Sequence, residues 1–122
     1  MPPLKPRILI CEDEEGVRES FKLILENDYS LDFARNGIEG LEKLRKTTPD
    51  LMILDIKMPK THGMDVLKEV KKLQPSLPVL IVTGYQSVEM AQEALRLGAA
   101  DYIPKPFESK TIKSAVARNI TK

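Results

Sequence analysis

The sequence predicts an α/β fold in which a parallel β-sheet carries helices on both faces. Short apolar runs alternate five times with segments whose apolar residues recur every three or four positions, which is typical of strand–helix units in a parallel sheet. The strand runs are apolar throughout, as expected for strands covered on both sides. Turn-forming Asn, Gly and Pro residues separate the units.

The pattern places both kinds of element along the chain. The expected strands are Arg7–Cys11, Leu31–Ala34, Leu51–Leu54, Val79–Val82 and Tyr102–Ile103. Each is followed by an apolar stripe with helical spacing, which predicts a helix with one face against the core. The stripes are Val17, Phe21, Ile24 and Leu25; Ile38, Leu41 and Leu44; Leu67, Val70 and Leu73; Val88, Ala91 and Leu95; and Ile112, Ala115, Val116 and Ile120.

Length and composition limit the function classes. The 122 residues fit one domain, 1–122, with a core at about 7–120 and an N-terminal extension at 1–6. With 19 basic and 18 acidic residues, the net charge of +1 does not favour a dedicated nucleic-acid or membrane binder. A single cysteine and the absence of an apolar run of about 20 residues predict a cytoplasmic protein.

Polar residues follow four of the expected strands. Glu12 and Asp13 come after the first strand and Asp55 after the third. Thr83 follows the fourth strand, and Lys105 lies just beyond the fifth. The carboxyl ends of parallel strands share one edge of the sheet, where ligands of open α/β folds bind. If the first and third strands are neighbours, the three carboxylates converge.

Such a group suits phosphoryl transfer. Converging carboxylates repel one another, which raises the pKa of at least one of them, and a divalent cation relieves the repulsion. Mg²⁺ prefers oxygen ligands of this kind. One carboxylate can then attack phosphorus while the metal and Lys105 hold the transferring oxygens. The sequence has no Gly-rich phosphate loop, no Cys/His cluster and no Ser-His-Asp candidate.

Each residue alone also has a structural interpretation. An acid pair such as Glu12 and Asp13 can cap the following helix, and a single strand-end Asp can do the same. Thr83 taken alone is a β-branched strand residue, Lys105 a surface charge and Tyr102 a core residue. These alternatives stay open for the individual positions, and only the joint placement favours phosphoryl transfer.

From about Arg7 to Ile120 the chain resembles the chemotaxis-type receiver domains of bacterial two-component response regulators. The resemblance implies a flavodoxin-like sheet of five parallel strands in the order 2-1-3-4-5, with five helices on both faces. It rests on Ile8-Leu9-Ile10-Cys11-Glu12-Asp13-Glu14, Asp55-Ile56-Lys57-Met58-Pro59 with Gly63, Val82-Thr83-Gly84 and Gly98-Ala99-Ala100-Asp101-Tyr102-Ile103-Pro104-Lys105-Pro106-Phe107.

The resemblance also implies roles for the acidic residues. Asp55 would be the phosphoacceptor, modified by a sensor histidine kinase or a phosphotransfer protein. Glu12 and Asp13 would bind Mg²⁺ together with Asp55 and the backbone carbonyl of Lys57. The domain would catalyse only its own phosphotransfer and autodephosphorylation, and it would not be an enzyme acting on an outside substrate.

Further roles follow from the same resemblance. Lys105 would contact the phosphoryl group and precede a cis peptide bond to Pro106. Thr83 would also contact the phosphoryl group and form a switch pair with Tyr102. The fourth helix, fifth strand and fifth helix would then form the output face. In addition, Lys57 and Tyr85, two residues beyond Asp55 and Thr83, would tune the rate of dephosphorylation.

The sequence gives less information about the effector through which the domain would signal. The segments 87–91 and 98–105 are most similar to receivers of nitrogen-regulation-type transcriptional activators, and the effector domain of such a regulator is not in this chain. A homodimer formed on phosphorylation is an expected partner arrangement. A stand-alone receiver and a docking module that never takes phosphate are the alternative functions. An aspartate-nucleophile phosphatase is disfavoured because it requires a second acid at the position of Lys57.

Overall fold

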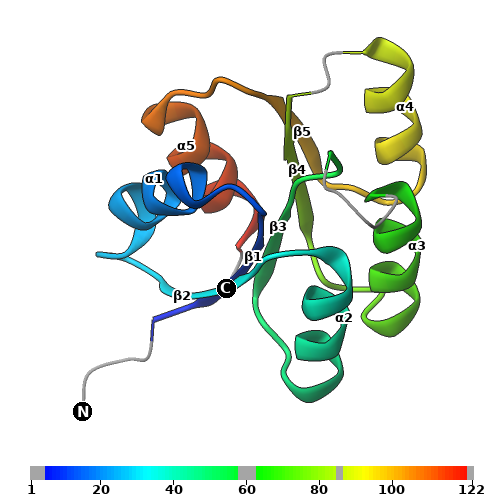
Figure 1. Ribbon diagram of the computed structural model, residues 1–122, viewed down its shortest axis with the longest axis horizontal. Helices are drawn as coiled ribbons and strands as arrows, with labels where there is room; N and C mark the ends of the chain where they lie inside the picture. The colour runs from blue at the N-terminus through cyan, green and yellow to red at the C-terminus, as the bar shows by residue number, and fades with distance from the viewer. Residues whose placement is uncertain (1–4, 58–62, 85–86, 121–122) are drawn as a thin grey trace.

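A computed structural model describes residues 5–57, 63–84 and 87–120 of the chain (Figure 1). All five expected strands are present, and each end lies within one residue of the expected position. Strands and helices alternate in the order β1 Arg7–Cys11, α1 Glu15–Leu25, β2 Ser30–Ala34, α2 Gly37–Lys46, β3 Leu51–Leu54, α3 Gly63–Leu73, β4 Val79–Thr83, α4 Val88–Arg96, β5 Asp101–Pro104 and α5 Ser109–Asn119.

The strands form one parallel sheet in the order β2-β1-β3-β4-β5, which confirms the order implied by the family resemblance. Strand β1 lies between β2 and β3, so that Cys11 is level with both Ala34 and Leu54. The strand order reverses at β1, which is where ligands bind in open sheets of this type. Because β1 and β3 are neighbours, the three carboxylates that follow them are expected to converge.

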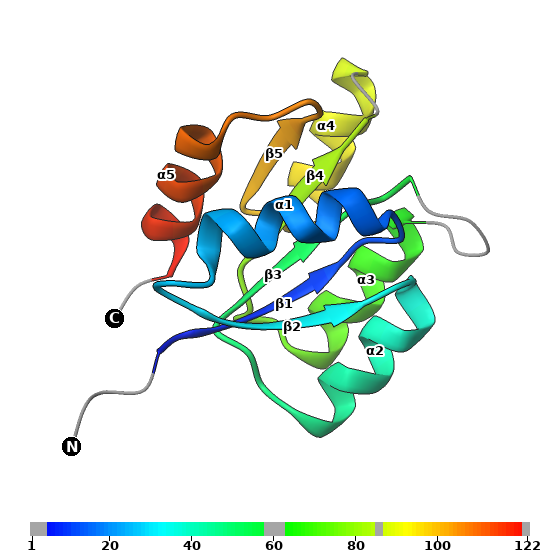
Figure 2. The same ribbon diagram turned by 60° about the vertical axis from the view of Figure 1, so that its left-hand side comes forward.

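Helices cover the two faces of the sheet unequally. Figures 1 and 2 show α1 and α5 on one face and α2, α3 and α4 on the other. Successive strand residues supply the two apolar layers alternately: Ile8 and Ile10 pack with α1 and α5, whereas Leu9 and Cys11 pack with the other three helices. None of the helices in the described part of the chain combines the length and apolar character needed to cross a membrane.

The predicted apolar stripe of α4 is wrong. Val88 is 67% exposed and Leu95 is 49% exposed, while the residue buried in the core is Ala94. Met90 and Leu97 pack beside it. Two stripes with the same helical period run along α4, and periodicity alone does not decide which of them faces the sheet.

Two further stripe positions also lie outside the core. Ile38 is 58% exposed and Leu73 is 40% exposed. Ile38 lies in the first turn of α2, and Leu73 is the last residue of α3. The core faces of these helices are formed by Leu44 and by Val66 with Val70, so the stripes extend beyond the part of each helix that the sheet covers.

Gly63 starts α3 at a point where no side chain fits. A Cβ at this position would collide with the backbone of Ile56. The absence of a Cβ lets the helix begin directly against the segment that follows Asp55, and so it links α3 to the carboxyl edge of the sheet.

We expect Gly63→Ala to lower the free energy of unfolding by about 1–3 kcal/mol, because the added methyl group has to displace backbone. The matched control is Gly16→Ala in α1, where a Cβ meets no atom within 4 Å. That change should raise stability by about 0.5–1 kcal/mol through helix propensity. Urea unfolding of the two variants measures both effects, and changes of the same sign would contradict the packing explanation.

Candidate functional site

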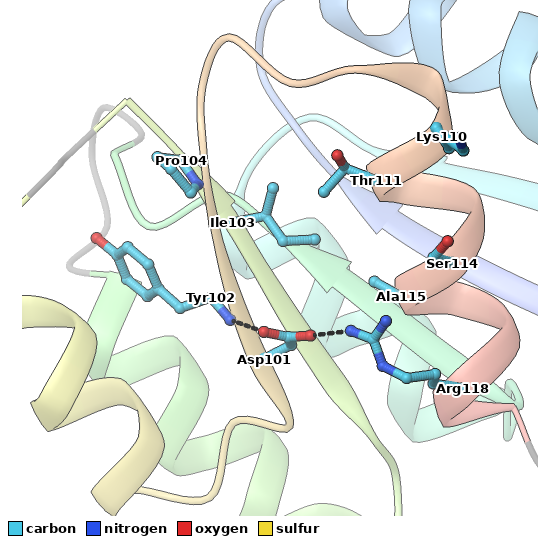
Figure 3. A pocket seen from close by; sticks show the side chains of 9 residues that line it. All are labelled: Asp101, Tyr102, Ile103, Pro104, Lys110, Thr111, Ser114, Ala115 and Arg118. Carbon is cyan, nitrogen blue, oxygen red and sulfur yellow. Dashed lines mark hydrogen bonds and ion pairs between the residues drawn. The ribbon is translucent and has the colours of Figure 1, made fainter.

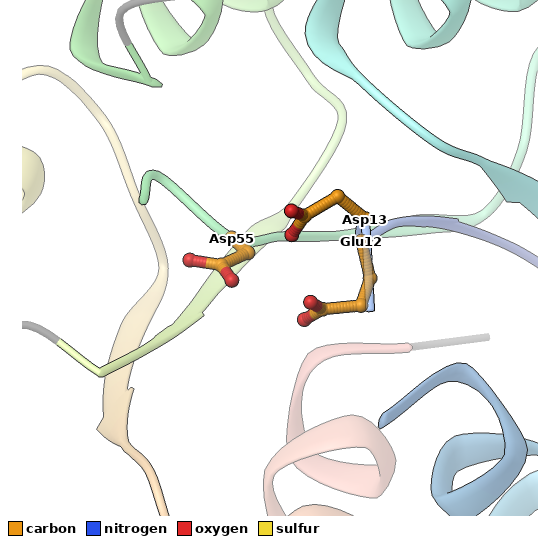
Figure 4. Close-up of side chains that lie close together, drawn as sticks. All are labelled: Glu12, Asp13 and Asp55. Carbon is orange, nitrogen blue, oxygen red and sulfur yellow. The ribbon is translucent and has the colours of Figure 1, made fainter. Parts of the chain in front are cut away.

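The carboxyl edge of the sheet brings three acidic side chains together. Oxygen atoms of Glu12, Asp13 and Asp55 lie within 4.8 Å of one another (Figure 4). The sheet fixes two of these residues through the backbone. The Glu12 amide donates to the Ala34 carbonyl at 2.9 Å, and the Asp55 amide donates to the Cys11 carbonyl at 3.0 Å. Each acid is therefore held one residue past the end of its strand.

Asp55 is buried and held at both oxygens. The carboxylate is only 3% exposed. Its Oδ1 accepts the backbone N–H of Lys57 at 2.8 Å, and its Oδ2 lies 2.8 Å from the Nζ of Lys105. Asp55 does not cap α3, which begins eight residues later at Gly63. Its side chain instead presents a fixed carboxylate at the edge of the sheet.

Lys105 is a partly buried cation beside this acidic group, with a side chain that is 15% exposed. Besides Asp55, its Nζ lies 2.9 Å from Glu12 Oε1 and 3.5 Å from Glu14 Oε1. Its amide donates to the Thr83 carbonyl at 2.8 Å, and the following peptide bond to Pro106 is cis. Burial lowers the pKa of the ammonium, but the contacts with Asp55 and Glu12 outweigh burial and raise it. The surface-charge interpretation of Lys105 is wrong.

Burial acts strongly on the carboxyl group of Glu12. It is 1% exposed, and its pKa is raised to about 7. Burial is the largest cause and the Asp55 carboxylate adds to it, whereas Lys105 opposes both. Oε2 accepts the Glu14 amide at 3.2 Å. Oε1 lies 2.9 Å from Lys105 Nζ as an ion pair, and no other partner of this atom is found among the described residues. The N-cap of α1 is Glu14, so Glu12 is not a helix cap.

Thr83 and Tyr102 lie on the neighbouring strands β4 and β5. Thr83 is completely buried at the end of β4. Tyr102 is half-buried, packs against the apolar layer of α2, α3 and α4, and borders a hollow of about 310 Å³ with Val88 and Ala91. Burial raises the pKa of the Tyr102 hydroxyl, and the Asp55 carboxylate contributes. Tyr85, the remaining residue of the predicted set, lies outside the described residues.

A larger hollow of about 440 Å³ lies between β5 and α5 (Figure 3). Its acidic residue, Asp101, is paired with Arg118 at 2.8 Å, and small side chains such as Thr111 and Ser114 leave the space open. This hollow lacks the convergent acids of the carboxyl edge. Its size alone does not make it a reaction site, and the convergent acids around Asp55 are the stronger candidate site.

The acidic group fits Mg²⁺. Its donors are carboxylate oxygens, the ligand type that this hard ion prefers, and no His or Cys belongs to the group. The buried Glu12 Oε1 has only the Lys105 ammonium as a partner among the described residues, and a cation or its bound water could satisfy its remaining acceptor capacity. The thiol of Cys11 points elsewhere, donating to the Asn36 carbonyl at 3.2 Å, and burial raises its pKa to about 12.

The family model of the response regulator receiver domain matches residues 8–117. The chain belongs to this family. Receiver domains bind Mg²⁺ at an acidic pocket, and the carboxylates of Glu12, Asp13 and Asp55 form such a pocket here.

Individual relatives agree with this assignment. The response regulator MprA of Mycobacterium leprae is 39% identical over 102 residues, which are 83% of this chain and 45% of the relative. The chain thus spans about half the length of the curated relatives it matches. A receiver domain from Methanospirillum hungatei JF-1 has 34% identity and a TM-score of 0.90, with 97% and 94% of the two chains covered.

A second solved structure is a response regulator from Burkholderia pseudomallei with a phosphorylated aspartic acid, a calcium ion and citrate. It is 26% identical, with a TM-score of 0.84, and the match covers 91% of this chain and 66% of that one.

Two residues of the site were missed from the sequence. Glu14 reaches Lys105 from the loop, and Arg18 of α1 donates two hydrogen bonds to the loop backbone. A basic residue in the first turn of the helix that follows an acid pair was the available signal for Arg18. The contact itself depends on how the loop bends, which periodicity does not report.

The raised pKa of Glu12 predicts a pH dependence of stability in the absence of Mg²⁺. Its folded-state pKa of about 7 exceeds the ordinary value of 4.5, so the folded state binds more protons between these values. Stability from this group is greatest below about pH 4.5 and declines as the pH rises through about 7. Urea unfolding in EDTA between about pH 5 and about pH 8 should show a decline that Glu12→Gln reduces. An equally steep decline in this variant would contradict the assignment to Glu12.

Proposed function

We propose that this domain is a phosphorylation-operated switch of a two-component system, and that Asp55 accepts the phosphoryl group from a phosphohistidine of a sensor kinase or phosphotransfer protein. The observation that carries the proposal is the buried Asp55 carboxylate, fixed between the Lys57 amide and the Lys105 ammonium beside two further acids. A purely structural role would not require so many like charges in one place.

The residues have complementary tasks in the transfer. An Asp55 oxygen attacks phosphorus, a new O–P bond forms, and the N–P bond breaks with its electron pair returning to the imidazole. Lys105, already 2.8 Å from Asp55, is placed to hold a phosphoryl oxygen. Mg²⁺ held by Glu12, Asp13 and Asp55, together with the Lys57 carbonyl, supplies positive charge toward the other phosphoryl oxygens when bound. Attack by water on phosphorus later restores the carboxylate and releases inorganic phosphate.

The proposed signal passes through Thr83 and Tyr102 to the face formed by α4, β5 and α5. The amide of Lys105 donates to the carbonyl of Thr83, so the phosphate-binding cation and the hydroxyl residue are directly linked. Tyr102 borders the hollow beside α4 and has space into which it can move. Phosphorylation would shift the equilibrium between two packing arrangements of this face. Control of transcription through an effector domain is proposed from the resemblance of segments 87–91 and 98–105 to receivers of transcriptional activators.

The decisive experiment is chemical labelling. Incubation with acetyl phosphate and Mg²⁺ should add the mass of one phosphate, stable to acid and labile to base. Asp55→Asn removes the nucleophile and should abolish the gain. Retention of the same label in Asp55→Asn would refute the role of Asp55. A folded wild-type protein that takes no label would favour the phosphate-independent docking module instead.

The lifetime of the phosphorylated state gives a separate expectation. By the family resemblance, the position two residues after Thr83 lines the path of the hydrolytic water, and we propose that Tyr85 slows the loss of phosphate by shielding. Tyr85→Ala should therefore speed the loss of phosphate, whereas Tyr85→Phe, which keeps the ring, should not. Decay of purified phosphoprotein in the presence of Mg²⁺, followed by mass spectrometry, measures the rate. Equal rates for wild type and Tyr85→Ala would exclude shielding.

A further inference from the structure

Arg18 of α1 contacts the loop between β1 and α1, which carries Glu12 and Asp13. Its Nη1 donates to the backbone carbonyl of Glu12 and to that of Asp13, both at 2.9 Å. Its own amide donates to the Glu14 carbonyl at 3.0 Å, as part of the first turn of α1. The side chain is half-buried, so it is a defined part of the loop packing and not a solvated charge.

The loop between β1 and α1 needs such a contact. Glu14, the N-cap of α1, makes no side-chain capping hydrogen bond, and its carboxylate lies 3.5 Å from Lys105 instead. Two successive carbonyl groups, those of Glu12 and Asp13, turn toward a single donor atom. A guanidinium group stabilises this arrangement because hydrogen bonds from a charged donor are stronger than those from a neutral one.

We propose that Arg18 is a positioning residue that presets the cation site. By holding both carbonyls, it fixes the directions in which the Glu12 and Asp13 side chains leave the backbone, without itself contacting the ion or the phosphoryl group. The inference rests on the proposed function of the same site. The inference adds Arg18, which lies outside the acidic group, to the residues that determine the affinity for Mg²⁺.

Removal of Arg18 has two opposite effects on the affinity for Mg²⁺, one through its charge and one through its hydrogen bonds to the loop. Loss of a positive charge near the acids would by itself strengthen the binding of a divalent cation. Loss of the two hydrogen bonds releases the loop and weakens binding, and outer contacts of this kind commonly change metal affinity by about 10- to 100-fold. The direction of the change therefore separates a positioning role from a general electrostatic one.

The test compares Arg18→Met with the control Lys22→Met. Lys22 is an exposed residue of the same helix, so its substitution removes the same charge and adds the same side chain. Isothermal titration calorimetry with Mg²⁺ on the unphosphorylated proteins should give a dissociation constant raised about tenfold or more in Arg18→Met. The control should stay within about twofold, and Arg18→Lys, which keeps a cationic donor, should be intermediate.

Two further readouts exclude a merely structural effect. In acetyl phosphate labelling, Arg18→Met should require more Mg²⁺ for half-maximal rate, with the rate at saturating Mg²⁺ close to wild type. The rise in melting temperature caused by Mg²⁺ should also be smaller in Arg18→Met than in the control. Equal losses of melting temperature with and without Mg²⁺, at unchanged affinity, would overturn the proposal.

The outcomes for Arg18 and for the proposed function are distinguishable. Unchanged or tighter Mg²⁺ binding in Arg18→Met, with normal labelling of wild type, rejects the positioning role alone. Failure of wild type to bind Mg²⁺ or take phosphate rejects the function and the inference together. If Arg18→Met does not fold, Arg18→Gln is measured in its place, and an affinity equal to wild type there rejects the positioning role.

Discussion

The contact between one partly buried ammonium and several carboxylates is the interaction on which the site depends. Lys105 lies within 3 Å of oxygens of both Asp55 and Glu12, and without it these acids would face one another across a poorly solvated space. The contact requires β1 beside β3 and a turn after β5 that returns to the same edge. The order of strands is thus a condition for the electrostatics, and a different order would leave separate acids with ordinary properties.

The placement of these groups was predictable because it follows from a simple rule of parallel sheets. Apolar strands ending in Glu12, Asp55, Thr83 and a turn with Lys105 have to present those residues at one edge. Periodicity alone did not give the order of the strands, which came from the family resemblance. The raised pKa of one carboxyl group also followed from convergence. That the group is Glu12 depends on how deeply its carboxyl is buried and how near Asp55 lies, and only the three-dimensional structure shows this.

Rotation of a helix and bending of a loop were not predictable in the same way. In α4, two interleaved stripes satisfy the helical period, and the structure buries Ala94 and exposes Val88. Similarly, Arg18 in the sequence is one more basic residue on an amphipathic helix, and its contacts with the loop carbonyls appear only in the structure. Both failures concern contacts between elements, where many arrangements are compatible with one pattern of hydrophobicity.

The exposed stripe of α4 fits the proposed switch for an energetic reason. Ala94 is the buried residue of α4, whereas α3 buries Val66, Leu67 and Val70. A shift of α4 therefore removes less apolar surface from the core than a shift of α3 would, and its cost is correspondingly lower. A phosphoryl group at Asp55 would shift the equilibrium between the two packing arrangements only by the difference in its interaction free energy with each of them. A weakly anchored helix beside Tyr102 is the element that such a limited difference can move.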